Sequence, residues 1–389
     1  MRQAIAKNLR TLWLLKGLES AWFPIPIIVL FYESHGLSLE QAVILKAILS
    51  AAFFIGEIPS GYFADHFGRK TSLICGSLFW LIGWLTYCTQ GSFAWFAIAE
   101  ITVGLGGSLM SGAESAIAYD SLLVLKRTSE YRAWEGKGVA IMGITEAVCG
   151  LVGAYVATWN LVYPFYLQTL CVFAYFCCAL TLCEPPRSKL EKTVSWRSLL
   201  TSIQAIFQKQ KSLRWLLLFS ATLSAGSFLM VWISQEYMTG RGFEVSDLGW
   251  AWVVFHSAMA IASFNVEIIA RRFSFRLIFA ALPILMAIAY IGMGLVESIW
   301  GVLFIMIVYG VRGVNMPLVL SYLNDQIPSN LRATLISVNS FTFRLMFIGV
   351  AAIASIASRI LGFEMSLILI GLIIGLIAYY GYLRLRLAL

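Results

Sequence analysis

The amino-acid sequence predicts an all-α integral membrane protein with twelve transmembrane helices in two pseudo-symmetric six-helix bundles. Of its 389 residues, 60% are hydrophobic and only 12% are charged. Soluble globular proteins are about 45–50% apolar and about 25% charged, so this composition excludes a water-soluble enzyme of this size. A spanning helix uses about 20 apolar residues, and the apolar runs here are separated by short polar breaks. The chain therefore has room for twelve spans and little room for an extramembrane catalytic domain.

Apolar runs between the polar breaks give the twelve predicted spans. Their ranges are 12–33, 42–64, 71–90, 93–120, 138–158, 162–183, 214–238, 247–270, 277–296, 298–324, 333–357 and 364–383. Pro24 and Pro26 should deform the first span, because each proline removes a helix donor.

The longest polar stretch, residues 184–213, divides the spans into two groups of six. We therefore expect two halves, 1–183 and 214–389, which is the arrangement of transporters built from repeats. Within this linker, the segment 196–207 has apolar residues at near-helical spacing beside basic ones. It predicts a short amphipathic helix on the membrane surface.

The lysine and arginine residues predict the orientation, because cytoplasmic loops carry an excess of them. With the amino terminus inside, 22 of the 28 basic residues fall in inner segments. Both termini are then cytoplasmic, and the net charge of +8 reflects membrane orientation rather than a nucleic-acid partner. We expect a monomer in a bacterial cytoplasmic membrane, in contact with membrane lipid.

No metal or cofactor is expected. The seven cysteines lie in apolar segments, where a free thiol behaves as a small hydrophobe. The three histidines are far apart, and no Cys/His ligand spacing occurs.

A signature motif follows the second predicted span, where residues 57–70 read EIPSGYFADHFGRK. It resembles the G-x-x-x-D-x-x-G-R-[KR] motif of the major facilitator superfamily, and it occurs in the loop between spans 2 and 3 where that family carries it. Gly61 would permit close helix contact and Gly68 a tight turn. The matching charged residues are Asp65, Arg69 and Lys70.

The resemblance implies a gate. In this family the loop aspartate interacts with the start of helix 11, and the loop arginine interacts with an acidic residue at the inner end of helix 4. Carried over, Asp65 would face the helix start near Ala333 and Thr334, and Arg69 would pair with Asp120. Such contacts would close the inner side in the outward-open state. The gating residues implied are Gly61, Asp65, Gly68, Arg69, Lys70, Asp120 and Arg332.

Three departures from the family pattern occur, and two of them concern the drug-antiporter subgroup. The second-half loop, residues 270–276, keeps the basic residues but lacks the glycines and the aspartate. Span 4 carries Glu100 before its glycine-rich run, where drug antiporters carry an arginine, and span 5 has no Gly-Pro dipeptide. The sequence therefore fits the superfamily better than this subgroup.

Ionisable residues inside the spans require a reason, because a charge at the bilayer centre costs about 2.5–3.5 kcal/mol on insertion scales. By helical rise, Glu19, Glu114 and Glu146 share one inner layer of the first half, and Arg312 and Arg344 lie near the midplane of the second half. They are either structural pairs or groups that face a central cavity. There a desolvated glutamate could carry a coupled proton, and an arginine could hold an anionic group.

The candidates divide by role. The proton-coupling candidates are Glu19, Glu114, Glu146 and Glu100, and the substrate-binding candidates are Arg312, Arg344, Trp22, Trp232 and His256. Lys16 and Lys46 are close enough to span ends to reach the membrane surface, so we expect both at the interface.

The sequence predicts a secondary active transporter and not an enzyme, because it contains no nucleotide-binding sequence and no catalytic constellation. We expect a small organic solute coupled to protons, with efflux placed ahead of uptake. The alternative is a proton-coupled importer of an anionic metabolite or siderophore, supported by Arg312 and Arg344. A third possibility is a transporter-like membrane sensor or lipid-handling protein.

Overall fold

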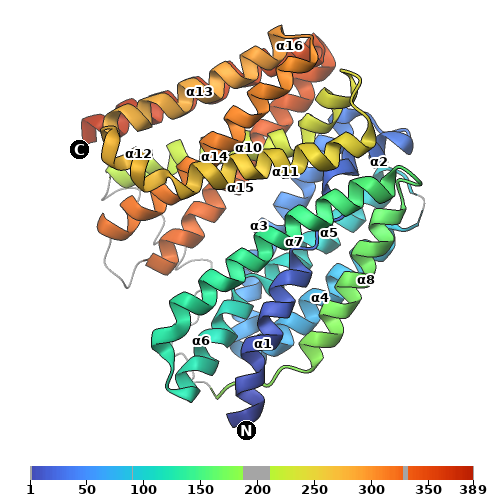
Figure 1. The fold of residues 1–389 in the computed structure, drawn as a ribbon, viewed down its shortest axis with the longest axis vertical. Coiled ribbons are helices and arrows are strands. Elements are labelled where there is room, and N and C mark those ends of the chain that lie inside the picture. Colours follow the sequence, from blue (N-terminus) through green and yellow to red (C-terminus); the bar gives the residue numbers. More distant parts are fainter. Residues whose placement is uncertain (1, 90, 187–210, 327–331, 389) are drawn as a thin grey trace. The chain divides into compact units, whose positions relative to one another are not determined.

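The computed structural model describes residues 2–89, 91–186, 211–326 and 332–388, and nearly all of them are helical (Figure 1). No strand occurs among these residues. The predicted amphipathic helix at 196–207 lies outside them. The helices are α1 (Arg2–Glu19), η1 (Ile25–Ile27), α2 (Ile28–Ser34), α3 (Leu39–Phe67), α4 (Arg69–Tyr87), α5 (Phe93–Met110), α6 (Ala113–Leu125), η2 (Thr128–Glu130), α7 (Tyr131–Ala157), α8 (Tyr163–Leu180), α10 (Lys211–Thr239), α11 (Val245–Phe264), α12 (Val266–Arg272), α13 (Phe275–Leu295), η3 (Ile299–Gly301), α14 (Val302–Gln326), α15 (Arg332–Leu361) and α16 (Phe363–Ala388).

The all-α membrane class is confirmed. Within the described residues, ten helices are long and apolar enough to cross a membrane. The other two predicted spans correspond to α1 with α2, which a break interrupts, and to α4. The number of twelve spans stays a prediction.

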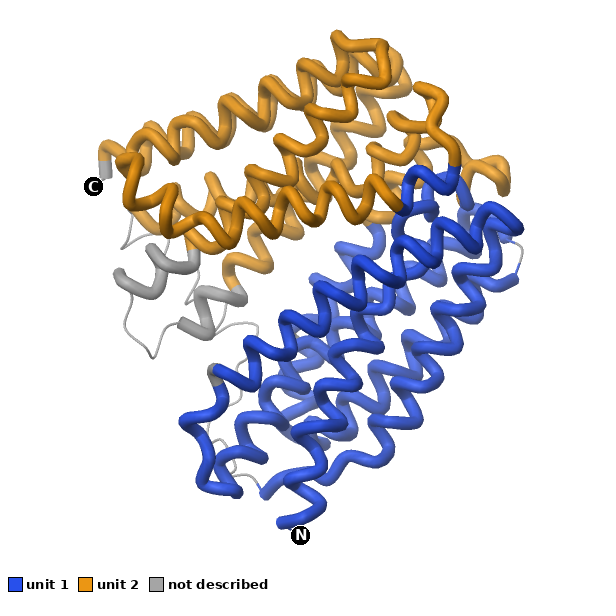
Figure 2. Tube along the Cα trace, viewed as in Figure 1, with its two compact units in different colours: residues 1–31, 48–196, 245–249 blue, residues 32–47, 197–244, 250–389 orange. Residues whose placement is uncertain are grey.

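The chain forms two compact units (Figure 2). Unit 1 comprises residues 1–31, 48–196 and 245–249, and unit 2 comprises residues 32–47, 197–244 and 250–389. In unit 1, α1 packs against α6, α7 and α8, and α4 packs against α5. In unit 2, the deeply buried α10 contacts α14, α15 and α16, and α13 lies beside α16.

Small residues bring α4 and α5 into close contact. A Cβ built on Gly106 would stand 2.7 Å from the carbonyl oxygen of Gly76. Glycine lets two helix backbones approach this closely. In a membrane the hydrophobic effect does not drive helices together, because lipid tails are equally apolar, so close packing of this kind stabilises their association. The glycine-rich run of span 4 therefore has a packing role.

The first span breaks where its prolines predict. Helix α1 ends at Glu19, and Pro24 caps the short 3-10 turn that follows. The open backbone is fixed by α8 and α7, because Gln168 Oε1 accepts a hydrogen bond from the Phe23 N–H at 3.2 Å. A Cβ built on Gly153 of α7 would overlap the carbonyl oxygen of Phe23, so this position requires glycine.

The fourth span is also broken, which the sequence analysis missed. Its two helices, α5 and α6, meet at Ser111 and Gly112, and Gly112 has a φ of 75°. Left-handed backbone is accessible to glycine at little cost. The break gives span 4 a second helix N-terminus inside the protein, and Glu114 lies in its first turn.

Candidate functional site: charged groups inside the helical units

The signature loop joins α3 to α4 through Gly68, whose φ of 110° suits glycine. The guanidinium of the next residue, Arg69, forms an ion pair with Asp120 of α6. It also donates to the carbonyl oxygen of Ala116 at 2.8 Å. The structure thus contains the Arg69–Asp120 pair that the resemblance implies, and this pair ties the start of α4 to α6.

Glu184 completes the loop. Its Oε1 accepts from the Arg69 backbone N–H at 3.0 Å, and its Oε2 accepts from the Lys70 N–H at 2.7 Å. A carboxylate at a helix N-terminus satisfies free donors and complements the helix dipole. Sequence reasoning missed Glu184, which it placed in the linker. The available signal was an acidic residue directly after the sixth apolar run.

The remaining gate residues named in the sequence analysis have fewer contacts that the structure describes. Asp65 is exposed on the last turns of α3. Among the described residues, a Cβ built on Gly61 would meet no atom within 4 Å. The close helix contact expected at Gly61 stays a prediction. The predicted contact of Asp65 with Ala333 and Thr334, and the side chain of Arg332, lie outside what the structure describes.

Lys16 forms a buried ion pair in unit 1. Its Nζ lies 2.9 Å from Oε1 of Glu135 on α7, and only 6% of Lys16 is exposed. Ser115 Oγ donates to the same carboxylate, at 3.2 and 3.3 Å from its two oxygens. The expectation that Lys16 reaches the membrane surface is therefore wrong, because a neighbouring helix supplies a carboxylate.

Glu114 and Glu19 surround this pair. Glu114 is 5% exposed, and its Oε1 accepts a hydrogen bond from the Tyr175 hydroxyl at 2.5 Å. Glu19, the last residue of α1, interacts electrostatically with Lys16 and Glu114, and Glu135 interacts with Glu114. We call Lys16, Glu19, Glu114 and Glu135, with Ser115 and Tyr175, the carboxyl cluster.

Glu146 lies further along α7. Helices α1 and α7 run parallel, because Lys16 meets Glu135, and a Cβ on Gly17 would stand 3.7 Å from Thr145 Oγ1. Glu146 is therefore level with the end of α1, as its predicted layer requires. Its participation in the cluster stays a prediction.

Glu100 is 2% exposed on α5 and precedes Glu114 by fourteen residues. At about 1.5 Å per residue the two are separated by about 20 Å along the span. The structure thus does not bring Glu100 into the carboxyl cluster.

Lys46 corrects a second expectation. It is 2% exposed rather than interfacial. Its Nζ donates to the Tyr32 hydroxyl at 3.2 Å and lies 4.8 Å from the centre of the Trp232 ring. Trp232, a substrate-binding candidate, thus forms part of a buried aromatic environment for this ammonium group.

Trp22 packs as a structural group. It stands in the break of the first span, with ring centres 5.4 Å from Trp80 and 6.3 Å from Trp84 of α4. Trp80 is itself fixed by a hydrogen bond from its Nε1 to the Val103 carbonyl oxygen at 2.9 Å.

Unit 2 brings two substrate-binding candidates together. His256 on α11 interacts electrostatically with Arg312 on α14. His256 Nδ1 donates to the Trp252 carbonyl oxygen at 3.0 Å. The His256 ring is tilted against the Trp252 ring, with centres 4.1 Å apart, and meets the Tyr309 ring edge to face, with centres 5.2 Å apart. Arg344, another candidate of this unit, is half-buried on α15.

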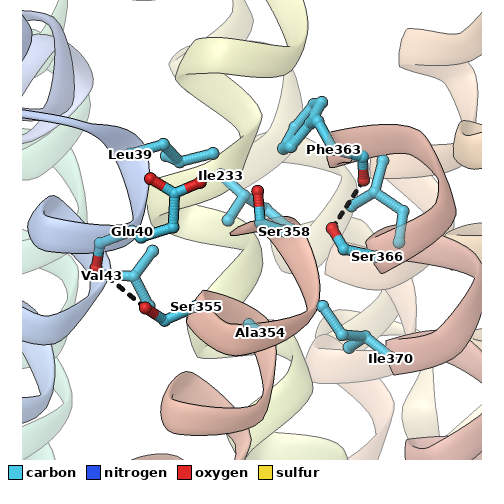
Figure 3. Close-up of a pocket in the computed structure, with 11 residues that line it drawn as sticks. Leu39, Glu40, Val43, Ile233, Ala354, Ser355, Ser358, Phe363, Ser366 and Ile370 are labelled. Carbon is cyan, nitrogen blue, oxygen red and sulfur yellow. Dashed lines mark hydrogen bonds between the residues drawn. The ribbon is translucent and has the colours of Figure 1, made fainter. Parts of the chain in front are cut away.

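One small cavity of unit 2 is lined by α3, α10, α15 and α16 (Figure 3). Its volume is about 10 Å³, and Ser355 Oγ donates across it to the Glu40 carbonyl oxygen at 3.4 Å. This space holds at most about one water molecule, so it is not a solute site.

Spanning helices that bury ion pairs and carboxyl groups are typical of membrane transport proteins. Residues 20–351 match the profile of the Major Facilitator Superfamily, and the chain belongs to this family. It is therefore a multi-pass membrane transporter and not an enzyme.

Two solved structures have the same fold. The D-xylose-proton symporter has a TM-score of 0.75 at 14% identity, over 98% of this chain and 96% of that one. The nucleoside transporter NupG has a TM-score of 0.74 at 13% identity, over 98% of both chains.

Two relatives by sequence are bacterial. An uncharacterised MFS-type transporter of Bacillus subtilis (strain 168), YxaM, is 24% identical over 89% of this chain and 86% of its own. The multidrug resistance protein MdtH of Blochmanniella pennsylvanica (strain BPEN) is 24% identical over 51% of this chain and 46% of its own.

Proposed function

We propose that this transporter couples proton movement to the transport of a small organic solute across a bacterial cytoplasmic membrane, with efflux as its direction. The halves 1–183 and 214–389 would alternate in their access to a central site, with both termini in the cytoplasm. The observation that supports proton coupling is the carboxyl cluster of unit 1.

The charges of the carboxyl cluster do not balance. Three carboxyl groups, on Glu19, Glu114 and Glu135, share the single ammonium group of Lys16. Burying a charge without compensation is costly, so the cluster requires protons or a bound cation to approach neutrality. Proton coupling requires a carboxyl group that takes up a proton when its surroundings close and releases that proton when water enters.

Helix breaks place two of these carboxyl groups. Glu19 ends α1, where the dipole of the helix disfavours a negative charge, whereas Glu114 lies in the first turn of α6, where the dipole favours one. These opposite environments set a balance of proton affinity between the two carboxyl groups, and Glu114 is the one that takes up and releases the coupled proton. Movement of either helix at its break would alter that balance.

Efflux is supported by the relatives named multidrug resistance proteins, one of which matches half of this chain. A specific observation favours the alternative, import of an anionic solute. His256 lies against Trp252 and interacts electrostatically with Arg312. These residues provide a cation, a titratable ring and an aromatic face for an organic anion.

We also propose that the signature loop is a gate, formed by Gly61, Asp65, Gly68, Arg69, Lys70, Asp120 and Arg332. Arg69 is held by Asp120 and Glu184 at the start of α4, so the loop is rigid where it begins the helix. The exposed Asp65 is the group available for a contact that forms and breaks.

Replacing Asp65 with asparagine is expected to slow transport and leave solute affinity within about twofold, because a surface contact of one state is lost and no cluster residue changes. Initial transport rates in proteoliposomes and binding by thermal shift would measure the two effects. Replacing the exposed Glu130 with glutamine is the control. Wild-type rates in the Asp65 variant would contradict the gate.

The proposed function is tested by flux of an identified solute. A thermal-shift screen of drugs, organic acids and siderophores at two pH values would identify it, and proteoliposomes with an imposed pH gradient would then measure its accumulation. Antiport predicts accumulation on the acidic side, and symport predicts accumulation on the alkaline side. Equal distribution under both gradients would overturn proton coupling.

A further inference from the structure

A cavity of about 500 Å³ lies in unit 1, between the first helix and the start of α7. It is formed by α1, the end of α6, η2 and the first turns of α7. This is the end of unit 1 that carries the amino terminus, which the basic residues predict to be cytoplasmic. The basic and aromatic residues of its lining include Lys7, Arg10, Trp13, Arg127, Trp134 and Lys137.

The cavity is strongly basic. Four basic side chains and one acidic side chain, Glu130, line it. Glu130 is already engaged, because Arg127 Nε and Nη2 each donate to one of its oxygens at 2.6 Å. Within the described parts of the chain, Lys7 and Arg10 have no acidic partner. Their charges are therefore available to an anion.

Two tryptophans form a fixed wall. The Trp13 and Trp134 rings are stacked, with centres 6.1 Å apart and an interplanar angle of 14°. Trp13 Nε1 donates to the Trp134 carbonyl oxygen, and Trp134 Nε1 donates to the Leu9 carbonyl oxygen, both at 3.1 Å. Both indole donors are thus used inside the protein, and the rings present an apolar face. Lys137 Nζ lies 5.6 Å from the Trp13 ring centre, over that face.

The helices that form the cavity also carry exposed apolar side chains. Leu14 follows Trp13, Leu123 follows the lining residue Leu122, and Val139 lies two residues beyond Lys137. All three side chains are more than half exposed. A ligand with a negative headgroup and a long apolar part would match the basic and aromatic cavity lining together with the exposed aliphatic side chains of the same helices.

We propose that this cavity binds the phosphodiester headgroup of an anionic phospholipid of the inner leaflet. Lys7, Arg10 and Lys137 contact the phosphate, and the tryptophan wall contacts the glycerol backbone. Basic pockets between spanning helices bind anionic headgroups in this way. A soluble phosphate compound would use the same cations but not the exposed aliphatic side chains, which is why a lipid is favoured.

The site would have a structural consequence. It bridges α1 and α7, the two helices that the Lys16–Glu135 pair joins further inside. A bound lipid would therefore hold these helices together at the membrane surface, independently of any transported solute.

The test uses the purified full chain in neutral detergent, with lipid binding followed by native mass spectrometry and by the midpoint of thermal unfolding. The lipid probes are phosphatidylglycerol and phosphatidylcholine, and the soluble probes are glycerol 3-phosphate and inorganic phosphate. We expect phosphatidylglycerol to bind and to raise the midpoint, with each lost cation weakening it about fivefold. Arg10→Gln with Lys137→Gln should thus weaken it about 25-fold.

The matched control removes the same charge elsewhere, by Arg2→Gln with Arg386→Gln, two exposed positions outside the cavity. This control should keep wild-type affinity. Lys7→Gln provides a second cavity variant if the double variant does not fold. Equal binding of phosphatidylcholine, or equal losses in the cavity and control variants, would overturn the proposal. Stabilisation by the soluble phosphates to the same extent would replace the lipid with a soluble anion and overturn it also.

Discussion

Replacing Glu114 with glutamine is expected to abolish solute accumulation driven by a pH gradient, while exchange of solute across the membrane continues. One pH unit is worth about 1.4 kcal/mol, so each coupled proton sustains up to about a tenfold solute gradient per unit in the wild type. The glutamine cannot carry the proton, yet its carbonyl oxygen still accepts the hydrogen bond from Tyr175. Accumulation of the solute against its gradient should disappear. Solute counterflow, measured in the same proteoliposomes, should persist.

The matched control for this loss is Glu130→Gln. Glu130 is an exposed carboxylate of unit 1 that pairs with Arg127 at the surface, outside the carboxyl cluster, so its replacement should leave the accumulation ratio unchanged. Wild-type accumulation in the Glu114 variant would remove this residue from the coupling path. Loss of counterflow together with accumulation would indicate a damaged protein rather than uncoupling.

Replacing Lys16 with methionine is expected to lower the free energy of unfolding by about 3 kcal/mol. The substitution removes the only ammonium group of the carboxyl cluster and leaves three carboxyl groups facing one another. This value is the lower end for a broken buried pair, because the Glu135 side chain remains 31% exposed to solvent. Unfolding by SDS titration in mixed micelles would measure the change.

A second substitution separates charge from packing. Adding Glu135→Gln to Lys16→Met removes the carboxylate that has lost its partner and should restore part of the lost stability. The reason is that the effects of substitutions at two contacting residues on the free energy of unfolding do not simply add. Arg2→Met, at an exposed position of the same helix outside the cavity, should change little. A double variant whose loss equals the sum of the single losses would show that the pair contributes no coupling energy.

Local sequence patterns predicted much of the fold. Apolar runs of spanning length predicted the membrane helices. Pro24 and Pro26 predicted a deformed first span, and the structure has α1 ending at Glu19 and a 3-10 turn after Pro24. The signature loop predicted the pair of Arg69 and Asp120, because the family motif fixes both its position and its partner. Each of these signals lies within a short stretch of sequence.

Partners from distant segments could not be predicted. Lys16 is 119 residues from Glu135, and Glu184 is 115 residues from Arg69. A lysine near a span end has the same local signal whether it reaches the surface or meets a carboxylate on a packed neighbour. The break at Gly112 was missed for a related reason, because one glycine in a glycine-rich run does not reveal which one adopts a left-handed backbone.

Proton movement caused by the solute itself tests the central claim most directly. Proteoliposomes with no initial pH gradient and a pH-sensitive dye in the lumen would receive the identified solute from outside. The antiport mechanism predicts that the lumen becomes more alkaline as solute enters, and that Glu114→Gln abolishes this change. Solute entry at the wild-type rate with no change in luminal pH would contradict proton coupling.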